Sequence, residues 1–441
     1  MSLADVAEWK KSGIFWSPMI PNSWSVLRFK ELLSYTTGIT PDSKNDSYFE
    51  LESGNSWITI GDMNARIVYE GKLGLSAKAL SEFQPSITPK GSLLFSFKLS
   101  IGKVCFAGKD FYTNEAIASI RSSSKYDLRF WFYYLPRVLH ENAIENIYGA
   151  KMLNQSIIVN MLMAVPSVDM QSKIADHLDS RCAAIDRKVA LLEQKRTAYG
   201  KLKRALINET VTRGLDKNAE LVDSGVEWIE SMPKGWTLRR LQDDYLYSKG
   251  LNITKDDLTD DGVPVVSYGQ IHSKTNGGVS LKDDLLRHVP PEVAAGSLNA
   301  KLKFGDCVFA DTSEDIEGLG NCVLVDRDDG VFAGYHALVA RPRRVGCAKY
   351  MAYQFQSKSW RGQLQAKAFG IKVFSVTQRM LKGVEYVCPP ISEQRRVADY
   401  LDRKCAAIDA AVENVTRQIE LYRKLKRSLI DEVVTGRRKV A

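Results

Sequence analysis

The feature that most constrains how this chain can fold is a long internal repeat. Residues 171–212 and 394–435 align without a gap at an offset of 223 positions, and 21 of the 42 aligned residues are identical. Both copies contain the pentapeptide CAAID, at 182–186 and at 405–409. Such a repeat indicates one structural unit used twice, so the rest of the chain has to be searched for the same duplication.

Both copies of the repeat have the hydrophobic spacing of a long helix. Apolar or small residues recur at steps of three and four, which is typical of a helix that buries one stripe against a partner. At about 1.5 Å per residue, each helix would span roughly 63 Å, more than the core of a small domain needs. The residues expected in the seam between the two helices are Ile174, Leu178, Cys182, Ile185, Val189, Leu192, Tyr199, Leu202 and Leu206 in the first copy, and Val397, Leu401, Cys405, Ile408, Val412, Val415, Ile419, Tyr422, Leu425 and Leu429 in the second.

The ends of the two helices carry further signals. Asp169 and Ser392 follow Pro166 and Pro389 and are favoured N-cap residues, so they mark the expected helix starts. Both copies end in the same basic KLKR sequence, which would repel its counterpart in a parallel pair. We therefore expect an antiparallel coiled coil and an internal pseudo-twofold repeat. An ordinary dimerisation helix would show the same stripe, and the argument against it is that the remainder of the chain repeats too.

The segments outside the helices form two weaker copies of one another. SGIFWSPMIPNSW at 12–24 is matched by SGVEWIESMPKGW at 224–236, and KGSLLFS at 90–96 by FGDCVFA at 304–310. Glycines and apolar positions persist in these matches, whereas the polar residues between them differ. A shared scaffold with different polar residues suggests two modules that each recognise something different.

Short apolar runs and longer aromatic-rich segments indicate that each module is α+β. The runs at 92–97, 104–108, 307–310 and 322–325 predict strands, and the segments 128–142 and 349–366 predict helices. We expect a curved sheet in each module. The predicted division is a first module at 1–165, a central long helix at 166–213, a second module at 214–388 and a C-terminal long helix at 389–441.

Composition restricts where the protein works and what it binds. The 441 residues suffice for two cores of ordinary size, and the net charge of +9 favours an anionic partner. No apolar run approaches the roughly 20 residues of a membrane span, and no segment resembles a signal peptide. The seven cysteines form no close pairs, which is typical of reduced thiols. We therefore expect a cytoplasmic protein with no membrane contact.

Catalytic and metal-binding motifs are missing from the sequence. Gly102-Lys103 would need a glycine at the position of Phe97 to make a phosphate-binding GxxxxGK, and no HExxH or CxxC occurs. No Asn/Asp-Pro-Pro-aromatic tetrad, which an amino-methyltransferase uses to hold a flipped base, is present. His336 is the one tempting catalytic residue, but sequence alignment places Glu115 opposite it and neither has a partner nucleophile. We predict no catalytic residues and no metal site.

The order of these parts resembles the specificity subunit of a Type I restriction-modification system. The resemblance covers essentially the whole chain, and its most specific part is PPISEQRRVADYLDRKCAAID at 389–409. One departure is Met170 before Gln171, where the family pattern has Glu; this puts a capping contact in doubt. The resemblance implies that each module is a target-recognition domain for one half of a split double-stranded DNA sequence, and that the helices set the gap between the halves and dock two modification subunits. It further implies that this chain is not catalytic and binds no cofactor. S-adenosylmethionine would bind to the modification subunits, and ATP and Mg²⁺ to restriction subunits where the system has them.

The divergent loops of the modules contain the side chains that such a task requires. Base pairs are read by placed donors and acceptors, while Lys and Arg hold phosphates. A solvated loop position or a turn cap explains any single one of these residues equally well. The expected DNA contacts are Lys98, Ser100, Lys103, Asn114, Tyr148, Lys151 and Asn154 in the first module, and Tyr268, Gln270, His272, Lys274, Thr312, Ser313, Tyr335, His336, Lys372 and Ser375 in the second.

Two alternative functions stay open at this point. The chain could be the recognition subunit of another methylation-based defence assembly, or a scaffold that joins two protein partners. A pure protein scaffold would need neither two divergent modules rich in polar loops nor a basic charge balance.

Overall fold

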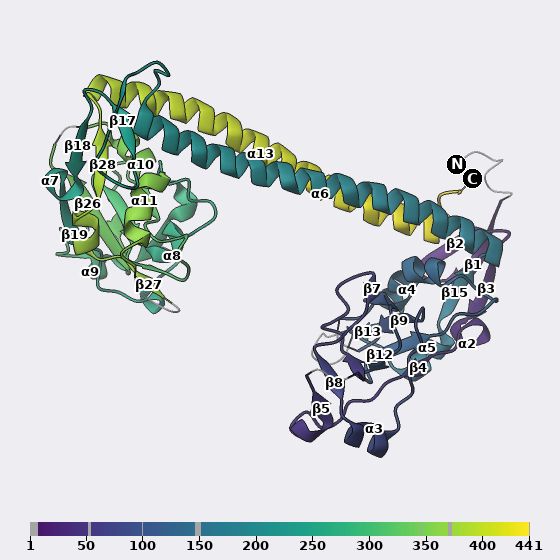
Figure 1. Ribbon diagram of the computed structural model, residues 1–441. Helices are drawn as coiled ribbons and strands as arrows, with labels where there is room; N and C mark the ends of the chain where they lie inside the picture. Colours follow the sequence, from purple (N-terminus) through teal and green to yellow (C-terminus); the bar gives the residue numbers. More distant parts are fainter. Residues whose placement is uncertain are drawn as a thin grey trace. The chain divides into compact units, whose positions relative to one another are not determined.

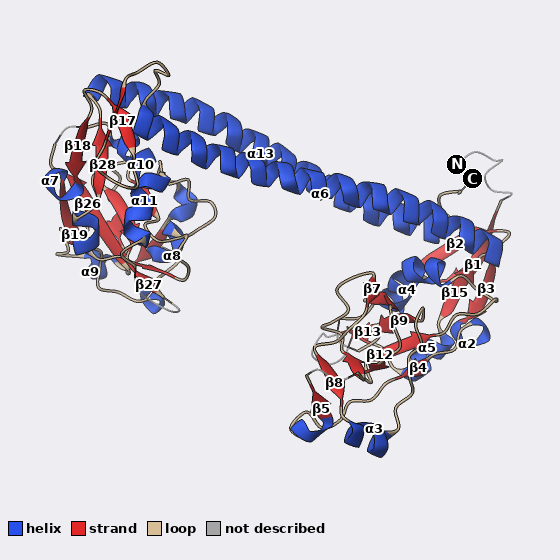
Figure 2. Cartoon of the chain, viewed as in Figure 1, coloured by secondary structure: helices blue, strands red, loops and turns tan. Residues whose placement is uncertain are grey.

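The computed structural model of the protein describes residues 8–51, 54–98, 100–145, 151–344, 346–368 and 373–440. Contacts divide the chain into two units, of which unit 1 comprises Met1–Leu191 and Gln418–Ala441, and unit 2 comprises Leu192–Arg417. Each unit contains one module and parts of two long helices, α6 (Val168–Arg213) and α13 (Ile391–Val434). Helices and sheets occur together in both modules, which confirms the predicted α+β class (Figure 2).

The two long helices pair in the antiparallel sense within each unit (Figure 1). In unit 1 the early part of α6 contacts the late part of α13, where Lys426 Nζ lies 2.7 Å from Asp186 Oδ2. In unit 2 the late part of α6 contacts the early part of α13, where Lys203 Nζ lies 2.8 Å from Asp409 Oδ2. These four residues occupy the same two positions of the repeat, so one ion pair is made twice. The predicted antiparallel pairing is confirmed inside each unit.

Burial along the helices follows the expected stripe except near the C-terminal ends. The seam residues before Tyr199 and before Ile419 are buried or half-buried. Leu202 and Leu425 were expected in the seam, but they are 52% and 51% exposed, whereas Ile207 and Val211 are buried instead. Leu206 and Leu429, one turn further on, are again half-buried and buried, so the expected stripe is interrupted at Leu202 and Leu425 and then resumes.

Both long helices begin one residue before the predicted N-caps. Because α6 starts at Val168 and α13 at Ile391, Asp169 and Ser392 already lie inside the first turn, and these two cap predictions were wrong. In α6 the cap is Ser167, whose Oγ accepts a bond of 3.4 Å from the backbone N–H of Met170.

A repeated glutamine fastens each helix start to its module. Gln171 Nε2 donates to the Pro166 carbonyl at 3.0 Å, and its Oε1 accepts from the backbone N–H of Asp127 at 3.0 Å. Gln394 makes the same pair of bonds, to the Pro389 carbonyl at 2.9 Å and from the backbone N–H of Cys347 at 3.2 Å. Both glutamines are buried. One side chain therefore sets the angle between helix and module in each unit.

Among the described residues, the first module contains one long helix, two larger sheets and the two-stranded sheets β1-β2 (Trp9–Ile14 and Ser17–Pro21), β3-β15 (Ser25–Arg28 and Leu162–Val165) and β13-β14 (Ile144–Glu145 and Lys151–Met152). Helix α4 (Leu128–Asn142) was predicted with the same bounds, and its aromatic residues share one core with strands β9 and β12. The first sheet has the order β4-β12-β9-β10-β7, with bounds Thr36–Thr37, Ile117–Ile120, Leu93–Ser96, Val104–Ala107 and Ile67–Val68. The second has the order β11-β6-β8-β5, with bounds Tyr112–Thr113, Ser56–Ile58, Leu73–Leu75 and Phe49–Glu50.

The second module repeats this plan with one broken helix. The segment 349–366 was predicted as a single helix, but it forms α10 (Ala348–Gln356) and α11 (Lys358–Gln365). Ser357 separates them because its backbone is extended and its Oγ accepts a bond from Trp360 N at 3.2 Å, which caps α11. The sheet orders are β19-β26-β22-β24, with bounds Tyr245–Lys249, Ala337–Pro342, Cys307–Ala310 and Cys322–Leu324, and β21-β20-β25, with bounds Arg287–Val289, Val263–Val266 and Phe332–Ala333.

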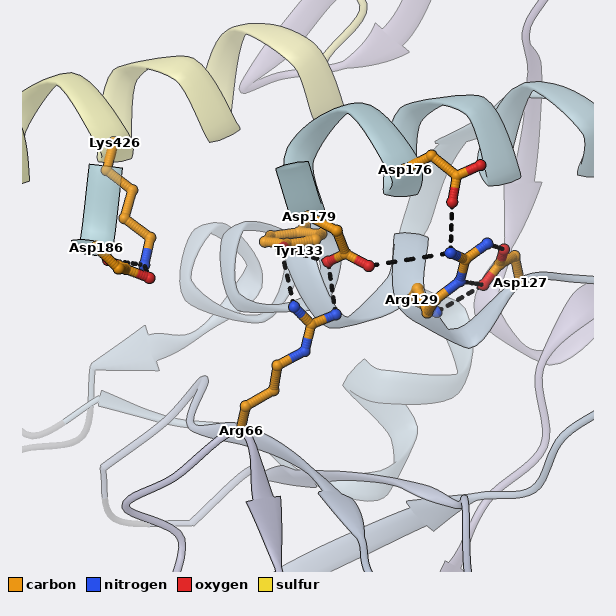
Figure 3. A network of polar contacts seen from close by, with 8 residues as sticks. All are labelled: Arg66, Asp127, Arg129, Tyr133, Asp176, Asp179, Asp186 and Lys426. Atoms are coloured by element: carbon orange, nitrogen blue, oxygen red, sulfur yellow. Dashed lines mark hydrogen bonds and ion pairs between the residues drawn. The ribbon is translucent and has the colours of Figure 1, made fainter. Parts of the chain in front are cut away.

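A repeated aspartate on the long helices holds each module in place. In unit 1, Asp179 accepts a 2.6 Å bond from Tyr133 Oη and pairs with Arg66 at 2.6 Å (Figure 3). Arg129 joins the same network through its Nη1, which lies 3.9 Å from Asp179 Oδ2, and it also pairs with Asp127 and Asp176. In unit 2, Asp402 occupies the same repeat position; it accepts from Tyr353 Oη at 2.8 Å and pairs with Lys349 at 2.7 Å. The two modules are thus seated by the same repeat position and a tyrosine.

Two further sequence expectations concern thiols and membranes. All seven cysteines are free, and five of them are buried. Among the residues that the structure describes, no helix combines the length and the apolar character that crossing a bilayer requires.

Candidate nucleic-acid interface

Three loops meet in each module at the positions where the two copies differ most in polar residues. In the first module, Phe97 N donates to the Ala116 carbonyl at 3.2 Å, and Lys103 Nζ donates to the Ile60 carbonyl at 3.2 Å. In the second, Asp311 N donates to the His336 carbonyl at 3.0 Å. We call these loops A (59–64 and 267–272), B (97–102 and 311–320) and C (114–116 and 334–336).

Equivalent backbone bonds show that the loops of the two modules correspond. Loop B is closed by a bond from Ser96 N to the Lys103 carbonyl at 2.9 Å, and in the second module by a bond from Ala310 N to the Asn321 carbonyl at 3.0 Å. The glycine before each closing residue has a left-handed backbone, with φ of +84° at Gly102 and +83° at Gly320, which favours a residue without a Cβ. Loop B is therefore the same hairpin with a longer insertion in the second module.

The backbone bonds also correct the alignment around His336. Its carbonyl accepts from the first residue of loop B, and the corresponding carbonyl in the first module belongs to Ala116 rather than to Glu115. The strand pairs Ser96 with Ile117 and Ala310 with Ala337 have the same register. Glu115 therefore corresponds to Tyr335, and the sequence alignment was displaced by one residue.

Four of the predicted contacts in the first module gather on loops B and C. Lys98 Nζ lies 3.6 Å from Glu115 Oε1, and both side chains are half exposed. Ser100 is exposed with φ of +25°. Lys103 Nζ is held by the Ile60 carbonyl and by Asn64 Oδ1 at 3.2 Å, while Asn114 Oδ1 accepts from Ala116 N. This group presents mainly cationic and amide groups.

The other predicted residues of the first module lie elsewhere. Asn154 caps α5 (Gln155–Asn160), where its Oδ1 accepts from Ile157 N at 2.8 Å, so the turn-cap alternative describes it. Lys151 lies on β14 (Lys151–Met152), with its Nζ 3.4 Å from His140 Nδ1. Tyr148 and, in the second module, Lys372 lie outside the described residues.

In the second module the loops surround a cleft of about 810 Å³. Five predicted residues line it, together with the acidic side chains Glu314, Asp315 and Glu317 from loop B. The predicted residues in the lining are Tyr268, His272, Thr312, Ser313 and His336. Sequence reasoning thus assembled one continuous surface here, but it missed the carboxylates that give this surface its charge.

Several residues of this surface are occupied by bonds inside the protein. His272 Nε2 donates to the Thr312 carbonyl at 2.7 Å, and its Nδ1 accepts from Asn321 Nδ2 at 3.0 Å, so both ring nitrogens are used. Gln270 Oε1 accepts from Ser267 N at 3.3 Å, and Ser313 Oγ donates to the Asp315 carbonyl at 2.6 Å. The hydrogen bonds of these side chains stabilise the loops that form the cleft.

The remaining predicted residues lie at or beside the cleft. Ser375 is exposed on β27 (Phe374–Ser375), which pairs with β23 (Thr312–Ser313) of loop B. Lys274 is exposed just after loop A. Tyr335 packs edge-on against Tyr268 with 5.5 Å between ring centroids, and burial raises the pKa of Tyr335, with Tyr268 adding to the shift. Its hydroxyl therefore stays protonated at neutral pH and can donate a hydrogen bond.

Sequence reasoning missed three further residues of the loops. Asn64 holds Lys103, Asn321 holds His272, and Asp311 Oδ1 lies 3.0 Å from His336 Nδ1. The signal that could have revealed two of them was the length of loop B in the second module, which carries Asp311, Glu314, Asp315 and Glu317 before its closing Asn321. The described side chains of the two surfaces differ in charge balance, because the first has Lys98 and Lys103 with Glu115, and the second cleft is lined by Glu314, Asp315 and Glu317.

Comparisons with known proteins find relatives that are similar to this chain in sequence. A family model described as "Type I restriction modification DNA specificity domain" matches residues 21–197. The chain is 26% identical over 249 residues to the Type I restriction enzyme MjaIX specificity subunit of Methanocaldococcus jannaschii, a match that covers 54% of this chain and 55% of that relative. The match thus spans about half the length of this relative. The MjaVIII specificity subunit of the same archaeon is 20% identical over 435 residues, which is 96% of this chain and 94% of that one.

Solved structures share the fold over nearly the whole chain. A chain from a structure of a type I R-M system has a TM-score of 0.70 at 14% identity and covers 95% of this chain and 99% of its own length. The HsdS subunit from Thermoanaerobacter tengcongensis has a TM-score of 0.51 at 14% identity, covering 95% and 98%. The chain is thus similar in sequence to specificity subunits of Type I restriction-modification systems, and it shares the fold of these solved structures.

Proposed function

We propose that the chain is the DNA-recognition subunit of a Type I restriction-modification complex, and that each module reads one half of a bipartite DNA sequence. The observation that carries this proposal is the contrast between the two copies. The contacts that seat the modules are repeated, as at Gln171 and Gln394, whereas loops A, B and C differ in their polar residues and loop B also differs in length. Two readers of different sequences on one scaffold would show this contrast.

The chemistry of the loops suits base recognition at one edge of each module. Amide, hydroxyl and imidazole groups can donate to and accept from base edges, and Lys98 and Lys274 can reach phosphates. The net charge of +9 gives an additional attraction to DNA that does not depend on sequence. The acidic lining of the second cleft repels phosphates, so this surface would meet base edges that carry amino groups.

The long helices supply the other two roles in this proposal. We infer that α6 and α13 set the gap between the half-sites and dock two modification subunits. S-adenosylmethionine would bind to those subunits, and ATP and Mg²⁺ to restriction subunits, while this chain would be non-catalytic. The alternative is a recognition or scaffold subunit of another methylation-based defence assembly, which would use the same loops with different partners.

An exchange of one module tests the proposal. Residues 237–388 would be replaced by the equivalent segment of a relative, and the variant would be co-expressed with the modification subunit before methylome sequencing. We expect one half of the methylated motif to change and the other to stay the same. The matched control is the unexchanged chain expressed alone, which should methylate nothing. A motif altered in both halves or in neither, or methylation by the chain alone, would contradict the proposal.

A further inference from the structure

The pair formed by His336 and Asp311 belongs to the cleft rather than to the scaffold of the second module. The corresponding positions in the first module are Ala116 and Phe97, which make the same backbone bond without any polar side-chain contact between them. The fold can therefore be built without a histidine and an aspartate at these positions. His336 also has a left-handed backbone, with φ of +52°, and a residue other than glycine is uncommon there. Such outliers gather at functional sites.

Asp311 determines which nitrogen of the His336 ring is available. A carboxylate can only accept, so the contact of 3.0 Å between His336 Nδ1 and Asp311 Oδ1 requires that Nδ1 carries the proton. Nε2 is then left as the polar atom that the ring can present to a ligand, because it lies at the opposite edge of the imidazole. The neutral ring with this tautomer has a lone pair on Nε2 and acts there as an acceptor.

The surroundings of the ring hold it facing the cleft. Its side chain is 55% exposed, and His336 is one of the residues lining the cleft. Tyr268 packs edge-on against it at 5.6 Å, and Tyr335 does so at 6.0 Å. The other histidine of the cleft, His272, has both nitrogens bonded inside the protein and cannot take the same role. Among the described residues of the lining, the carboxylates of Glu314, Asp315 and Glu317 are charged groups that act as acceptors.

We propose that His336 is a specificity-determining residue of the second module, whose Nε2 accepts a hydrogen bond from the exocyclic amine of an adenine or a cytosine, and that Asp311 is its positioning residue. In the major groove, adenine N6 and cytosine N4 are donors, whereas guanine N7 and O6 and thymine O4 are acceptors. A cleft that presents acceptors selects amines over carbonyls. This inference rests on the proposed function, because it names the chemistry that one reading surface recognises.

Base analogues measure this contact directly. The complex of the full chain with its modification subunit would be bound under mildly alkaline conditions to DNA carrying the motif that the complex methylates. Each adenine of the motif would be replaced in turn by purine, and each cytosine by 2-pyrimidinone, which removes one amine at a time. With the unaltered chain, removing the recognised amine should raise Kd by about 2- to 12-fold, the range for one hydrogen bond.

The His336→Phe variant keeps the ring packing against Tyr268 and removes Nε2, and His336→Ala removes the ring. In both variants, the cost of removing the amine should vanish at one position in the half-site of the second module. The costs in the half-site of the first module should stay the same, which provides an internal control for folding and binding. Asp311→Asn should reduce the cost at the same position, because an amide supports either tautomer of the ring.

The outcomes separate this inference from the proposed function. If the unaltered complex shows no sequence-specific DNA binding, the proposed function fails. If it binds specifically but His336→Phe and His336→Ala change no amine cost, the inference alone is overturned. The variants could instead change the rise in Kd that is caused by 7-deazaguanine, which lacks the N7 acceptor, or by thymine lacking O4. That outcome would overturn the role of His336 Nε2 as an acceptor. Unchanged costs in Asp311→Asn would remove Asp311 from the proposal.

Discussion

Leu178 and Leu401 offer a matched test of how the modules are held on the long helices. They occupy the same position of the repeat, both are 0% exposed, and each lies in the core of its own unit. Replacing a fully buried leucine by alanine costs about 2–5 kcal/mol, because transfer free energy is lost and a cavity remains. We expect Leu178→Ala to destabilise unit 1 by this amount and Leu401→Ala to destabilise unit 2. Leu202→Ala and Leu425→Ala are matched controls, since these residues are half exposed and should cost less than about 1 kcal/mol.

Hydrogen exchange can assign each loss of stability to a unit. A destabilisation of about 2–5 kcal/mol raises the exchange rate of the most protected amides by roughly 30-fold to several thousandfold, when they exchange by opening of that unit. Leu178→Ala should accelerate exchange in α4, and Leu401→Ala should do so in α10, with the other helix unaffected in each case. Equal acceleration of both helices by either variant would refute the reasoning, because the two cores would then unfold together. An equally large effect of the exposed controls would refute the assignment of burial.

Two further perturbations test electrostatics and helix length. Burial alone would raise the pKa of Asp244, but hydrogen bonds from Arg239 and Tyr386 outweigh this effect and lower the pKa. The stability that this carboxylate contributes to the folded state is therefore complete above about pH 4 and is lost as the pH falls further. Asp244→Asn should therefore cost about 1.5–3 kcal/mol at pH 7 and weaken the acid dependence of unfolding in denaturant titrations, whereas an unchanged acid dependence would contradict this role. Inserting four residues after Gln194 would add about 6 Å of helix. Methylome sequencing should then show unchanged half-sites separated by one or two more base pairs, at about 3.4 Å each. An active complex with an unchanged gap between the half-sites would show that the helices do not measure DNA.

The parts of the fold that follow from local patterns could be predicted from the sequence. The helix 128–142 was predicted to the residue from its aromatic-rich segment, and in the structure Asp127 Oδ1 caps its start by accepting from Arg129 N. The antiparallel pairing followed from a module lying between two matching stripes. The break at Ser357 was missed because the serine lies between Gln356 and Lys358, where it does not interrupt the apolar positions of the helical period, and only its cap to Trp360 reveals it.

The parts of the site that depend on sheet register could not be predicted in this way. The structural counterpart of His336 is Ala116, whereas the sequence alignment gave Glu115. The strand pairing decides which residue ends loop C, and this pairing cannot be seen in the sequence. Met170 was thought to affect a capping contact. Its counterpart Glu393 instead accepts a bond of 3.0 Å from Trp236 Nε1, which joins the start of a helix to the start of a module. Contacts of this kind depend on tertiary structure and leave no local signal.

The repeated ion pairs of the long helices are better explained by register than by stability. The carboxylates of Asp186 and Asp409 are more than half exposed, and exposed pairs typically contribute less than about 1 kcal/mol. In each unit, however, the pair joins a lysine of one helix to an aspartate of the other, so sliding α6 along α13 by one helical turn would break it. Asp179 and Asp402 then fix each module relative to the helix that carries it. Helix length can determine the gap between two half-sites only if the register between the helices is fixed and if each module is firmly attached to its helix. The repeated contacts would therefore fulfil a requirement of the proposed measurement of DNA, which burial of the apolar stripe alone does not meet.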